Sequence, residues 1–271
     1  MDIIKEDIEA LRREKYAGDP KADMQADIAR LSESEPLAYV IGTQPFLGLT
    51  LHLDSKPLIP RPETEWWTEK LIKHIGTRSC HVLDLCAGSG AVGLAILKHC
   101  PNTVVSFGEL IAEHEATILK NVHSNGVDPA RVDIRIGDLF TPFTIEERDT
   151  PDGTLRLGQA ARSGVSSGVS SGYFDIIATN PPYIPNTRAL SASVTQFEPA
   201  EALFAGTDGL DVIKTIATET PRHLNQGGEL WMECDIENIV QAKELLDARA
   251  VRTEIQQDQY DRPRLVIAYY P

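Results

Sequence analysis

The sequence predicts an α/β fold built on one mostly parallel sheet of seven strands. Short apolar runs alternate with segments of helical periodicity from His81 onward, and this alternation places parallel strands in one sheet with helices on both faces. A glycine-rich turn follows the first run, as expected where a strand leads directly into a helix. The last two runs leave no room for a helix between them, so we expect an antiparallel pair at one edge.

Two smaller units precede the α/β domain. In residues 1–35, apolar positions three and four apart predict a short helical segment of two amphipathic helices, separated at Gly18-Asp19-Pro20. Residues 36–60 predict a β-hairpin linker, because apolar side chains alternate from Phe46 to Leu53 and turn-forming residues follow at 54–57. We expect the hairpin to turn at 54–57 and to continue into Leu58-Ile59.

Residues 61–271 predict the α/β domain itself. We expect helices at 65–75, 91–99, 112–124, 210–223 and 236–248, and strands at 81–85, 103–107, 132–136, 174–179, 229–234, 251–255 and 265–269. Residues 141–172 lack apolar periodicity and end in SGVSSGVSSG, a composition typical of a flexible linker. We interpret 141–172 as a flexible insert within the domain and not as a domain boundary.

Composition excludes several classes of protein. Of the 271 residues, 42% are hydrophobic and 24% are charged, which argues against global disorder. No apolar run approaches the ~20 residues that a membrane-spanning helix needs, so we expect no membrane partner. Lys and Arg number 26 against 40 Asp and Glu, and the net charge of −14 repels phosphates, so we expect no stable nucleic-acid binding.

The cysteines and histidines predict neither a disulfide framework nor a metal site. The 4 cysteines form no C-x-x-C pair, and the 7 histidines show neither H-E-x-x-H nor another ligand spacing. Reduced thiols of this kind indicate an intracellular protein. The first 35 residues are rich in acidic side chains, which cleavable targeting peptides avoid.

The turn after the strand 81–85 is the first motif that carries chemistry. Its glycines allow a sharp turn and expose main-chain N–H groups at a helix start, where a ligand can bind. Gly88, Gly90 and Gly93 spell the dinucleotide fingerprint G-x-G-x-x-G, but they begin late after the strand. Asp84 lies within that strand, and an acid followed by such a turn suits S-adenosylmethionine, which carries an ammonium and a sulfonium group. The alternative is an ordinary strand-to-helix turn.

Acidic residues also follow the next two strands. Glu109 stands where a carboxylate can accept hydrogen bonds from both ribose hydroxyls, as in dinucleotide-binding folds. Its alternative role is that of a solvated acid at a helix start. Asp138 lies beside Leu139, and this pair can bracket an adenine with a carboxylate and an apolar wall.

The sequence Asn180-Pro181-Pro182-Tyr183 follows the strand 174–179 and gives the sharpest prediction. The Asn180 side-chain oxygen and the Pro181 carbonyl can accept the two N–H hydrogens of a planar NH₂ group, on a backbone that the prolines stiffen. Tyr183 offers a flat face for stacking. An amide or an exocyclic amine fits these acceptors, and positioning would lower the barrier to its alkylation. A plain proline turn is the structural alternative.

These residues resemble the HemK-type (PrmC-like) protein-(glutamine-N5) methyltransferases. The resemblance also covers PLAYVIG at 36–42, LIPRPETE at 58–65, FEPAEALFAG at 197–206 and DGL at 208–210. It is much more specific than N-P-P-Y alone, which adenine-N6 methyltransferases share. The resemblance implies a class I S-adenosylmethionine-dependent methyltransferase with a Rossmann-like sheet.

The resemblance also implies roles for residues. Cofactor contacts would come from Cys86, Ala87, Gly88, Ser89 and Gly90, together with Glu109 and with Leu139 beside the adenine. Asn180 to Tyr183 would grip the glutamine of the Gly-Gly-Gln motif in a class 1 peptide-chain release factor, with Asn180 also beside the cofactor.

Three features depart from the family pattern. The helical segment before Pro36 is about half the expected length, and Cys86 replaces the usual first glycine, which we expect to be tolerated at negative φ. The third departure is the insert at 141–172. Together with Cys86, this insert resembles fungal mitochondrial members of the family. We therefore expect a location in the mitochondrial matrix, with the cytoplasm as the alternative. An adenine-N6 methyltransferase and an inactive relative remain the competing functions.

Overall fold

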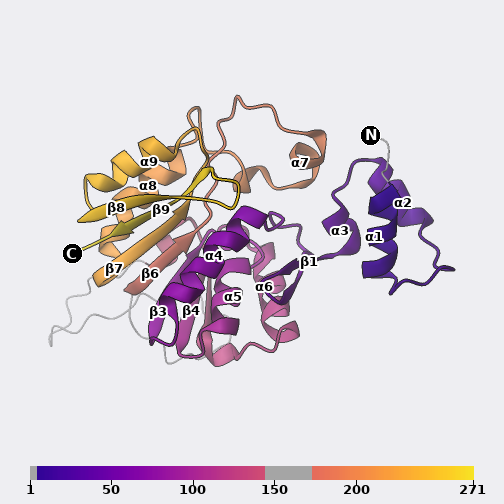
Figure 1. Cartoon of the computed structure of the whole chain (residues 1–271), viewed down its shortest axis with the longest axis horizontal. Coiled ribbons are helices and arrows are strands. Elements are labelled where there is room, and N and C mark those ends of the chain that lie inside the picture. The colour runs from indigo at the N-terminus through magenta and orange to yellow at the C-terminus, as the bar shows by residue number, and fades with distance from the viewer. Residues whose placement is uncertain (1–4, 144–172) are drawn as a thin grey trace.

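The computed structural model describes residues 5–143 and 173–271 of the chain (Figure 1). Its helices are α1 (Lys5–Lys15), α2 (Gln25–Ser32), α3 (Leu37–Ile41), α4 (Pro62–Ile75), α5 (Ala91–His99), α6 (Glu113–Ser124), α7 (Ala192–Phe197), α8 (Asp211–Glu219) and α9 (Ile239–Asp247). Its strands are β1 (Thr43–Phe46), β2 (Leu49–His52), β3 (Cys80–Leu85), β4 (Thr103–Glu109), β5 (Val132–Ile136), β6 (Phe174–Thr179), β7 (Leu224–Glu233), β8 (Arg252–Gln257) and β9 (Pro263–Tyr269).

A seven-stranded sheet organises the molecule, in the order β5-β4-β3-β6-β7-β9-β8. Strands β3 to β7 pair in parallel, and β9 runs antiparallel to both β7 and β8. The predicted α/β class and the antiparallel pair at one edge are therefore confirmed. The antiparallel strand itself, β9, lies one place in from that edge because it is inserted between β7 and β8.

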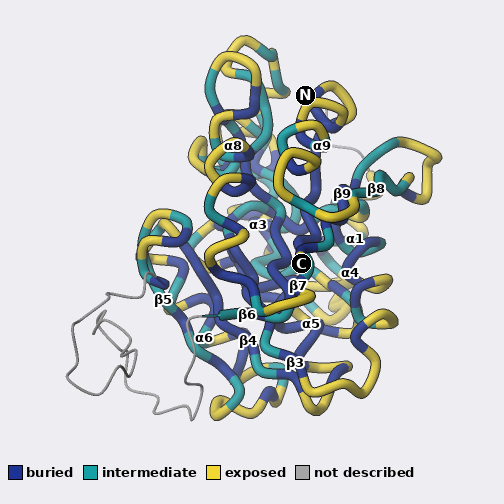
Figure 2. Tube along the Cα trace, turned by 90° about the vertical axis from the view of Figure 1, so that its left-hand side faces the viewer, coloured by how far each residue is buried: buried dark blue, intermediate teal, exposed yellow. Residues whose placement is uncertain are grey.

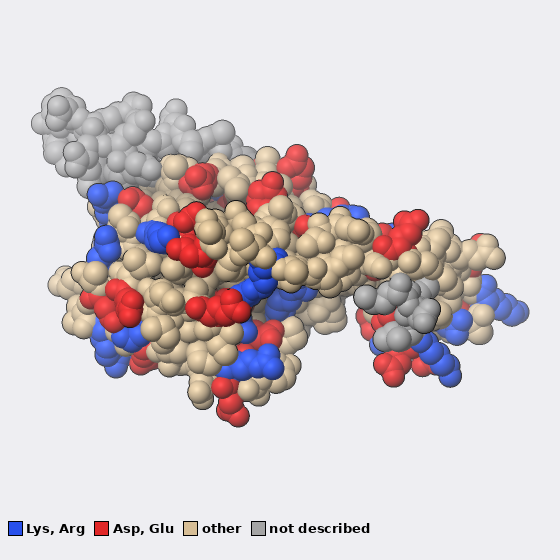
Figure 3. Space-filling view, turned by 90° about the horizontal axis from the view of Figure 1, so that it is seen from above, with Lys and Arg blue, Asp and Glu red and all other residues tan. Residues whose placement is uncertain are grey.

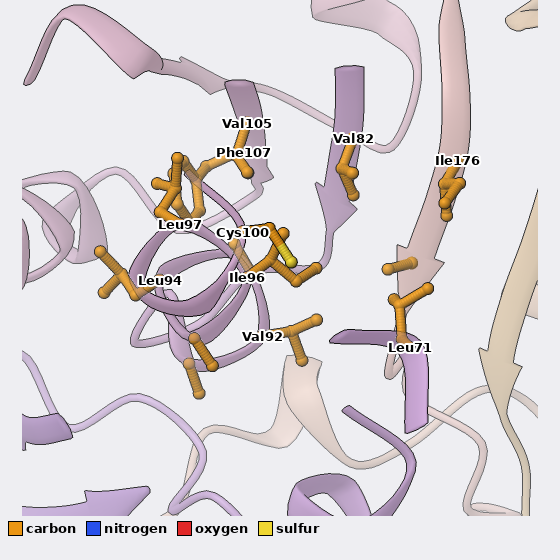
Figure 4. Packing of buried hydrophobic residues seen from close by; sticks show 14 of the residues in the cluster. Leu71, Val82, Val92, Leu94, Ile96, Leu97, Cys100, Val105, Phe107 and Ile176 are labelled. Carbon is orange, nitrogen blue, oxygen red and sulfur yellow. The ribbon is translucent and has the colours of Figure 1, made fainter. Parts of the chain in front are cut away.

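Helices cover both faces of this sheet, and successive strand residues alternate between the two. Val82 packs with α4, α5 and α6 in one apolar cluster (Figure 4), whereas Leu83 packs with α8 and α9 in the other. The central strands β3, β4 and β6 are accordingly buried along most of their length (Figure 2). Burial on both faces explains why the central strands appear in the sequence as continuous apolar runs.

The N-terminal helices form a small unit with its own apolar cluster. Figure 1 shows α1, α2 and α3 together at one end of the molecule, beyond the hairpin. Glu35 connects this unit to the hairpin region, since its carboxylate accepts hydrogen bonds from both Arg30 and Lys56. The hydrogen bond from Arg30 is the main reason why the pKa of Glu35 falls to about 2. Charged contacts therefore help to connect the N-terminal helices to the hairpin region.

The hairpin is present, but its predicted turn is wrong. The chain reverses at Leu47-Gly48, between β1 and β2, and residues 54–57 lead out of the hairpin instead of turning it. Both Leu47 and Gly48 have positive φ, which is the conformation that two-residue hairpin turns require. Leu58-Ile59 consequently form no strand.

Several boundaries also differ from the sequence prediction. Helix α4 starts at Pro62, because proline is well suited to the first turn of a helix, where its missing N–H has no partner to lose. The short helices α3 and α7 were not predicted. Thr141–Phe143, the start of the predicted insert, form a 3₁₀ turn with Phe143 buried against Phe174. The remainder of the predicted insert, 144–172, lies outside the described residues.

Gly93 allows α5 to approach the sheet closely. A Cβ atom at this position would lie 2.4 Å from Cε1 of Phe107 and 2.8 Å from Cγ1 of Val105, both on β4. The third glycine of G-x-G-x-x-G has the same packing role in dinucleotide-binding folds. Here it lets the helix start beside the tip of β3.

We expect Gly93→Ala to lower the free energy of unfolding by about 1–3 kcal/mol, because the added methyl group overpacks a filled core. Helix propensity alone predicts the opposite, a gain of about 1 kcal/mol. Urea unfolding of the two proteins distinguishes these outcomes. Adding Phe107→Leu to the variant should recover part of the loss, and a Gly93→Ala protein as stable as the wild type would contradict the packing role.

Candidate active site

A cavity of about 250 Å³ opens at the carboxyl ends of the parallel strands. Cys86 and Gly88 line it from the turn after β3, Glu109 from the end of β4, and Asn180 from the loop after β6. Ligands bind at this edge in open α/β sheets. The structure thus brings together residues that the sequence places in three separate motifs.

Asp84 does not line this cavity, and its predicted contact with a ligand stays a prediction. It is 2% exposed, and its carboxyl group accepts a hydrogen bond of 2.8 Å from the N–H of Gly93. That N–H belongs to the first turn of α5, whose preceding residue, Gly90, has no side chain to cap it. Asp84 therefore caps α5 from within β3. Burial raises the pKa of Asp84 to about 8.

Glu109 shapes the turn as well as lining the cavity. One carboxylate oxygen accepts a hydrogen bond of 2.7 Å from the N–H of Gly88, and the other accepts one of 2.8 Å from the N–H of Ile111. The solvated helix-start role is excluded, because Glu109 is 6% exposed. The carboxylate holds the β3 turn against the start of α6.

Cys86 corrects an expectation, because its φ is +63° and not negative. A non-glycine residue in this region costs of order 1–3 kcal/mol, which the surrounding structure must offset. The next residue, Ala87, donates its N–H to Gly108 O at 3.1 Å, and this bond holds the chain in the turn. Burial raises the pKa of the Cys86 thiol to about 12, so the thiol stays protonated at neutral pH.

The other predicted residues of the turn contact neighbouring helices. Ser89 accepts a hydrogen bond from Asn121 on its carbonyl oxygen, and Gly90 packs against Leu94 with φ +79°. Ala87, Ser89 and Gly90 do not line the cavity. They help to form the turn, and their contact with a cofactor stays a prediction.

Asp138 and Leu139 both line the cavity, as the sequence predicts. The chain turns sharply here, since Leu139 has φ +46° and the Asp138 carbonyl accepts hydrogen bonds from the N–H and the hydroxyl of Thr141. The contact with an adenine stays a prediction.

The N-P-P-Y loop divides into residues that line the cavity and residues that anchor the loop. Asn180 and Pro182 line the cavity, whereas Pro181 and Tyr183 do not. The Tyr183 hydroxyl donates to Glu233 Oε1 at 3.0 Å, and its carbonyl accepts from Asn238. Tyr183 therefore anchors the loop, and the stacking role stays a prediction.

Sequence reasoning missed other residues of the site. Phe204 and Glu201 line the cavity from the segment 197–206, which contributed to the resemblance but was given no site role. His114 lines it from α6, and no local sequence pattern marks this residue. The His114 Nδ1 atom lies 2.8 Å from Ser55 Oγ, and burial lowers the pKa of His114 below its usual value.

An ion pair between half-buried Arg61 and buried Glu198 joins the segment 59–61 to the segment 197–206. Arg61 donates to both carboxylate oxygens of Glu198, at 2.6 and 2.7 Å, and Glu198 also accepts from the N–H of Ile59. The segment around 59–61 is therefore fixed to the one that carries Phe204. Both bonds to Arg61 come from one guanidinium nitrogen, and such charge-assisted hydrogen bonds are among the strong ones.

Residues 5–143 and 173–271, the part of the chain that the structure describes, lack two features. Within these ranges, no three His, Cys, Asp or Glu side chains gather closely enough to hold a metal ion. The same ranges contain no helix that combines the length and the apolar character needed to cross a membrane.

Solved structures similar to this chain share its fold. A methyltransferase from Pyrococcus furiosus matches 90% of this chain and 98% of its own, with a TM-score of 0.54 and 16% identity. SMU.776, described as a putative methyltransferase complexed with SAH, matches 83% of this chain and 55% of its own, with a TM-score of 0.53 and 13% identity. At these identities the likeness establishes the methyltransferase fold alone.

Curated relatives carry the family assignment. The release factor glutamine methyltransferase of Mycolicibacterium smegmatis is 30% identical over 243 residues, which cover 89% of this chain and 77% of the relative. That of Bordetella pertussis is 31% identical over 226 residues, covering 83% and 73%. The Chlamydia trachomatis protein of the same name is 29% identical over 259 residues, covering 93% and 79%.

No family model matches the chain. The similarity to the curated relatives nevertheless extends over most of both sequences. They confirm the family-level resemblance seen in the sequence. The chain belongs to the family of release factor glutamine methyltransferases.

Proposed function

We propose that this protein transfers a methyl group from S-adenosylmethionine to the side-chain amide nitrogen (N5) of the glutamine in the Gly-Gly-Gln motif of a class 1 peptide-chain release factor. The relatives that share its family are named for this activity. The observation that carries the proposal is the position of Asn180, which lines the cavity immediately beyond the tip of β6.

The cavity residues fit S-adenosylmethionine. Each Glu109 oxygen accepts one N–H bond, so each keeps a lone pair that can accept a ribose hydroxyl. Leu139, Ile111 and Phe204 supply apolar surface of the kind that an adenine ring covers. When bound, S-adenosylmethionine supplies an electrophilic methyl group on its sulfonium ion.

The chain's own contribution is to position the substrate nitrogen. Asn180 Oδ1 and the Pro181 carbonyl would accept the two N–H hydrogens of the glutamine amide and hold its plane in one orientation. Correct placement of reacting groups can supply several kcal/mol of barrier lowering without a strong base. The same acceptors disfavour a carboxylate, because it has no hydrogen to donate to them.

Adenine-N6 methylation is the main alternative, because adenine also presents a planar NH₂ group. The net charge of −14 opposes binding of nucleic-acid phosphates. Figure 3 shows acidic and basic side chains interspersed on the face it presents, and such a mixture gives little steering toward a polyanion. Methylation of an oligonucleotide, with no activity on release factors, would favour this alternative over the proposal.

We also propose a mitochondrial location, with a mitochondrial release factor as substrate. The support is the resemblance alone, through Cys86 and the insert at 141–172. Microscopy of the tagged protein in its native cell tests it, and a cytoplasmic signal would contradict it.

Glu109→Gln should weaken cofactor binding. A glutamine places an NH₂ group against one of the two main-chain N–H donors, which disrupts the turn that lines the cavity. Loss of one hydrogen bond to a charged group is worth about 1.5–3 kcal/mol, or about a tenfold to hundredfold rise in Kd for S-adenosylmethionine. Titration calorimetry measures it. Glu113→Gln, an exposed change of equal charge, is the control, and equal affinities in both variants would contradict the role of Glu109.

Asn180→Ala should reduce turnover about 100-fold or more, because the glutamine amide loses an acceptor that fixes its position. Cofactor affinity should largely survive. The assay incubates enzyme, S-adenosylmethionine and purified release factors, and then maps the Gly-Gly-Gln peptide by mass spectrometry.

The exposed variant Asn186→Ala serves as the control for this experiment. Full activity of Asn180→Ala would end the positioning mechanism. A wild-type protein that does not bind S-adenosylmethionine would instead indicate an inactive relative.

A further inference from the structure

A buried hydrogen-bond network lies directly behind the N-P-P-Y loop. It joins Thr64 and Trp67 on α4 to Glu233 at the end of β7, and it reaches Asn180 and Tyr183 in the loop itself. Thr64, Trp67 and Glu233 are each at most 4% exposed. Thr64 lies in the segment 58–65, which contributed to the resemblance but was given no site role, and Trp67 and Glu233 belong to no predicted motif.

The hydrogens in this network fix the direction of each bond. Glu233 Oε2 lies 2.7 Å from Thr64 Oγ1 and 2.7 Å from Trp67 Nε1. An indole N–H can only donate, so Oε2 accepts from Trp67, and Oε1 accepts from the Tyr183 hydroxyl. Burial raises the pKa of Glu233, and these hydrogen bonds oppose the rise by favouring the ionised carboxylate, whose oxygens can only accept. With Glu233 ionised, the single hydroxyl hydrogen of Thr64 is donated to Oε2.

Thr64 can then only accept from Asn180. The atom of Asn180 that lies 3.2 Å from Thr64 Oγ1 must be its amide nitrogen, Nδ2. The two ends of an amide are otherwise interchangeable in shape, so this bond decides which end is which. Asn180 lines the cavity and Thr64 does not, which leaves Oδ1 as the polar atom available on the cavity side.

This orientation determines what the cavity accepts. An asparagine oxygen accepts a hydrogen from a substrate amide, whereas a flipped asparagine would present NH₂ and favour a carboxylate. Glutamine and glutamate side chains have nearly the same shape, but glutamine is neutral with an NH₂ donor, whereas ionised glutamate is an anion that can only accept. A network that prevents the flip therefore discriminates between them.

The backbone of the loop does not depend on Thr64. Its path is held by pairing of β6 with β3, by the Asn238 side chain on the Tyr183 carbonyl, and by the bond from Ile184 N to Leu203 O. Removing the Thr64 hydroxyl should consequently free the Asn180 side chain while leaving the main chain in place.

We propose that Thr64, oriented by Glu233, is a positioning residue that holds the Asn180 amide with its oxygen toward the substrate and so selects glutamine over glutamate. The inference rests on the proposed function, since it concerns the residue that would contact the substrate amide. It adds a determinant of specificity on α4, away from the N-P-P-Y motif.

Thr64→Val tests the proposal, because valine keeps the shape of threonine and removes its hydroxyl. We compare methylation of a recombinant release factor with binding of the same factor carrying glutamate in place of the Gly-Gly-Gln glutamine. The expected result is a kcat/KM for the glutamine factor lower by about tenfold, as for loss of one well-placed hydrogen bond. The preference for binding glutamine over glutamate should fall by a similar factor, with unchanged affinity for S-adenosylmethionine.

Thr68→Val provides a matched control. Thr68 is equally buried one turn along α4, and its hydroxyl donates to the main-chain oxygen of Thr64 without contacting Asn180. This variant removes the same group from the same helix, so it should keep the wild-type preference. Thr64→Ser should restore both activity and preference, because serine retains the hydroxyl. Thr64→Ala replaces Thr64→Val if the latter does not bind S-adenosylmethionine.

The outcomes separate this inference from the function on which it rests. If the wild type methylates the release factor but Thr64→Val matches Thr68→Val in rate and preference, the inference is overturned and the function stands. If the wild type binds S-adenosylmethionine but methylates no release factor, the proposed function fails and the inference fails with it. A lower rate with an unchanged preference between glutamine and glutamate also overturns the specificity role.

Discussion

The parallel register of three central strands decides where the site can form. Leu85 of β3 pairs with Gly108 of β4 on one side and with Thr179 of β6 on the other. One step further along each strand stand Cys86, Glu109 and Asn180, and all three line the cavity. Because parallel strands end at a common edge, this single register turns three distant sequence motifs into neighbours.

Buried carboxyl groups then give the loops at this edge their shape. Asp84 caps α5, Glu109 holds the turn after β3 against α6, and Glu233 receives hydrogen bonds from α4 and from the N-P-P-Y loop. A buried carboxyl group is costly unless its oxygens are satisfied, so each one commits its donors to a fixed geometry. Acids that look equivalent in the sequence thus have different roles, and only Glu109 of these three also lines the cavity.

The segments on either side of the cavity are joined by polar contacts. Arg61 and Glu198 fix the loop before α4 to the segment after α7, and Arg188 pairs with Asp235 at the end of β7. These pairs connect parts of the chain that share no strand pairing. The relative position of these loops beside the cavity therefore depends on charge pairing. Charged hydrogen bonds are directional, whereas apolar packing is not.

The sequence by itself determined the class of fold and most of the elements. Alternation of apolar runs with helical periodicity predicted α5, β5 and β6 with the bounds that the structure has, because burial on both faces leaves few other patterns. The motifs also predicted that Glu109, Asp138, Leu139 and Asn180 would share one site. Local sequence carries this information, since each motif directly follows a strand end.

Only the tertiary structure decided the role of each residue in that site. No local pattern shows that Asp84 accepts the capping hydrogen bond of α5, that Cys86 has a positive φ, or that His114 lines the cavity. The side-chain partner of Asn180 is Thr64 on α4, which in turn donates to Glu233 on β7, and both lie far away in the chain. Hydrogen-bond direction depends on which donors and acceptors lie close together in the folded chain, and the order of residues in the sequence does not show this.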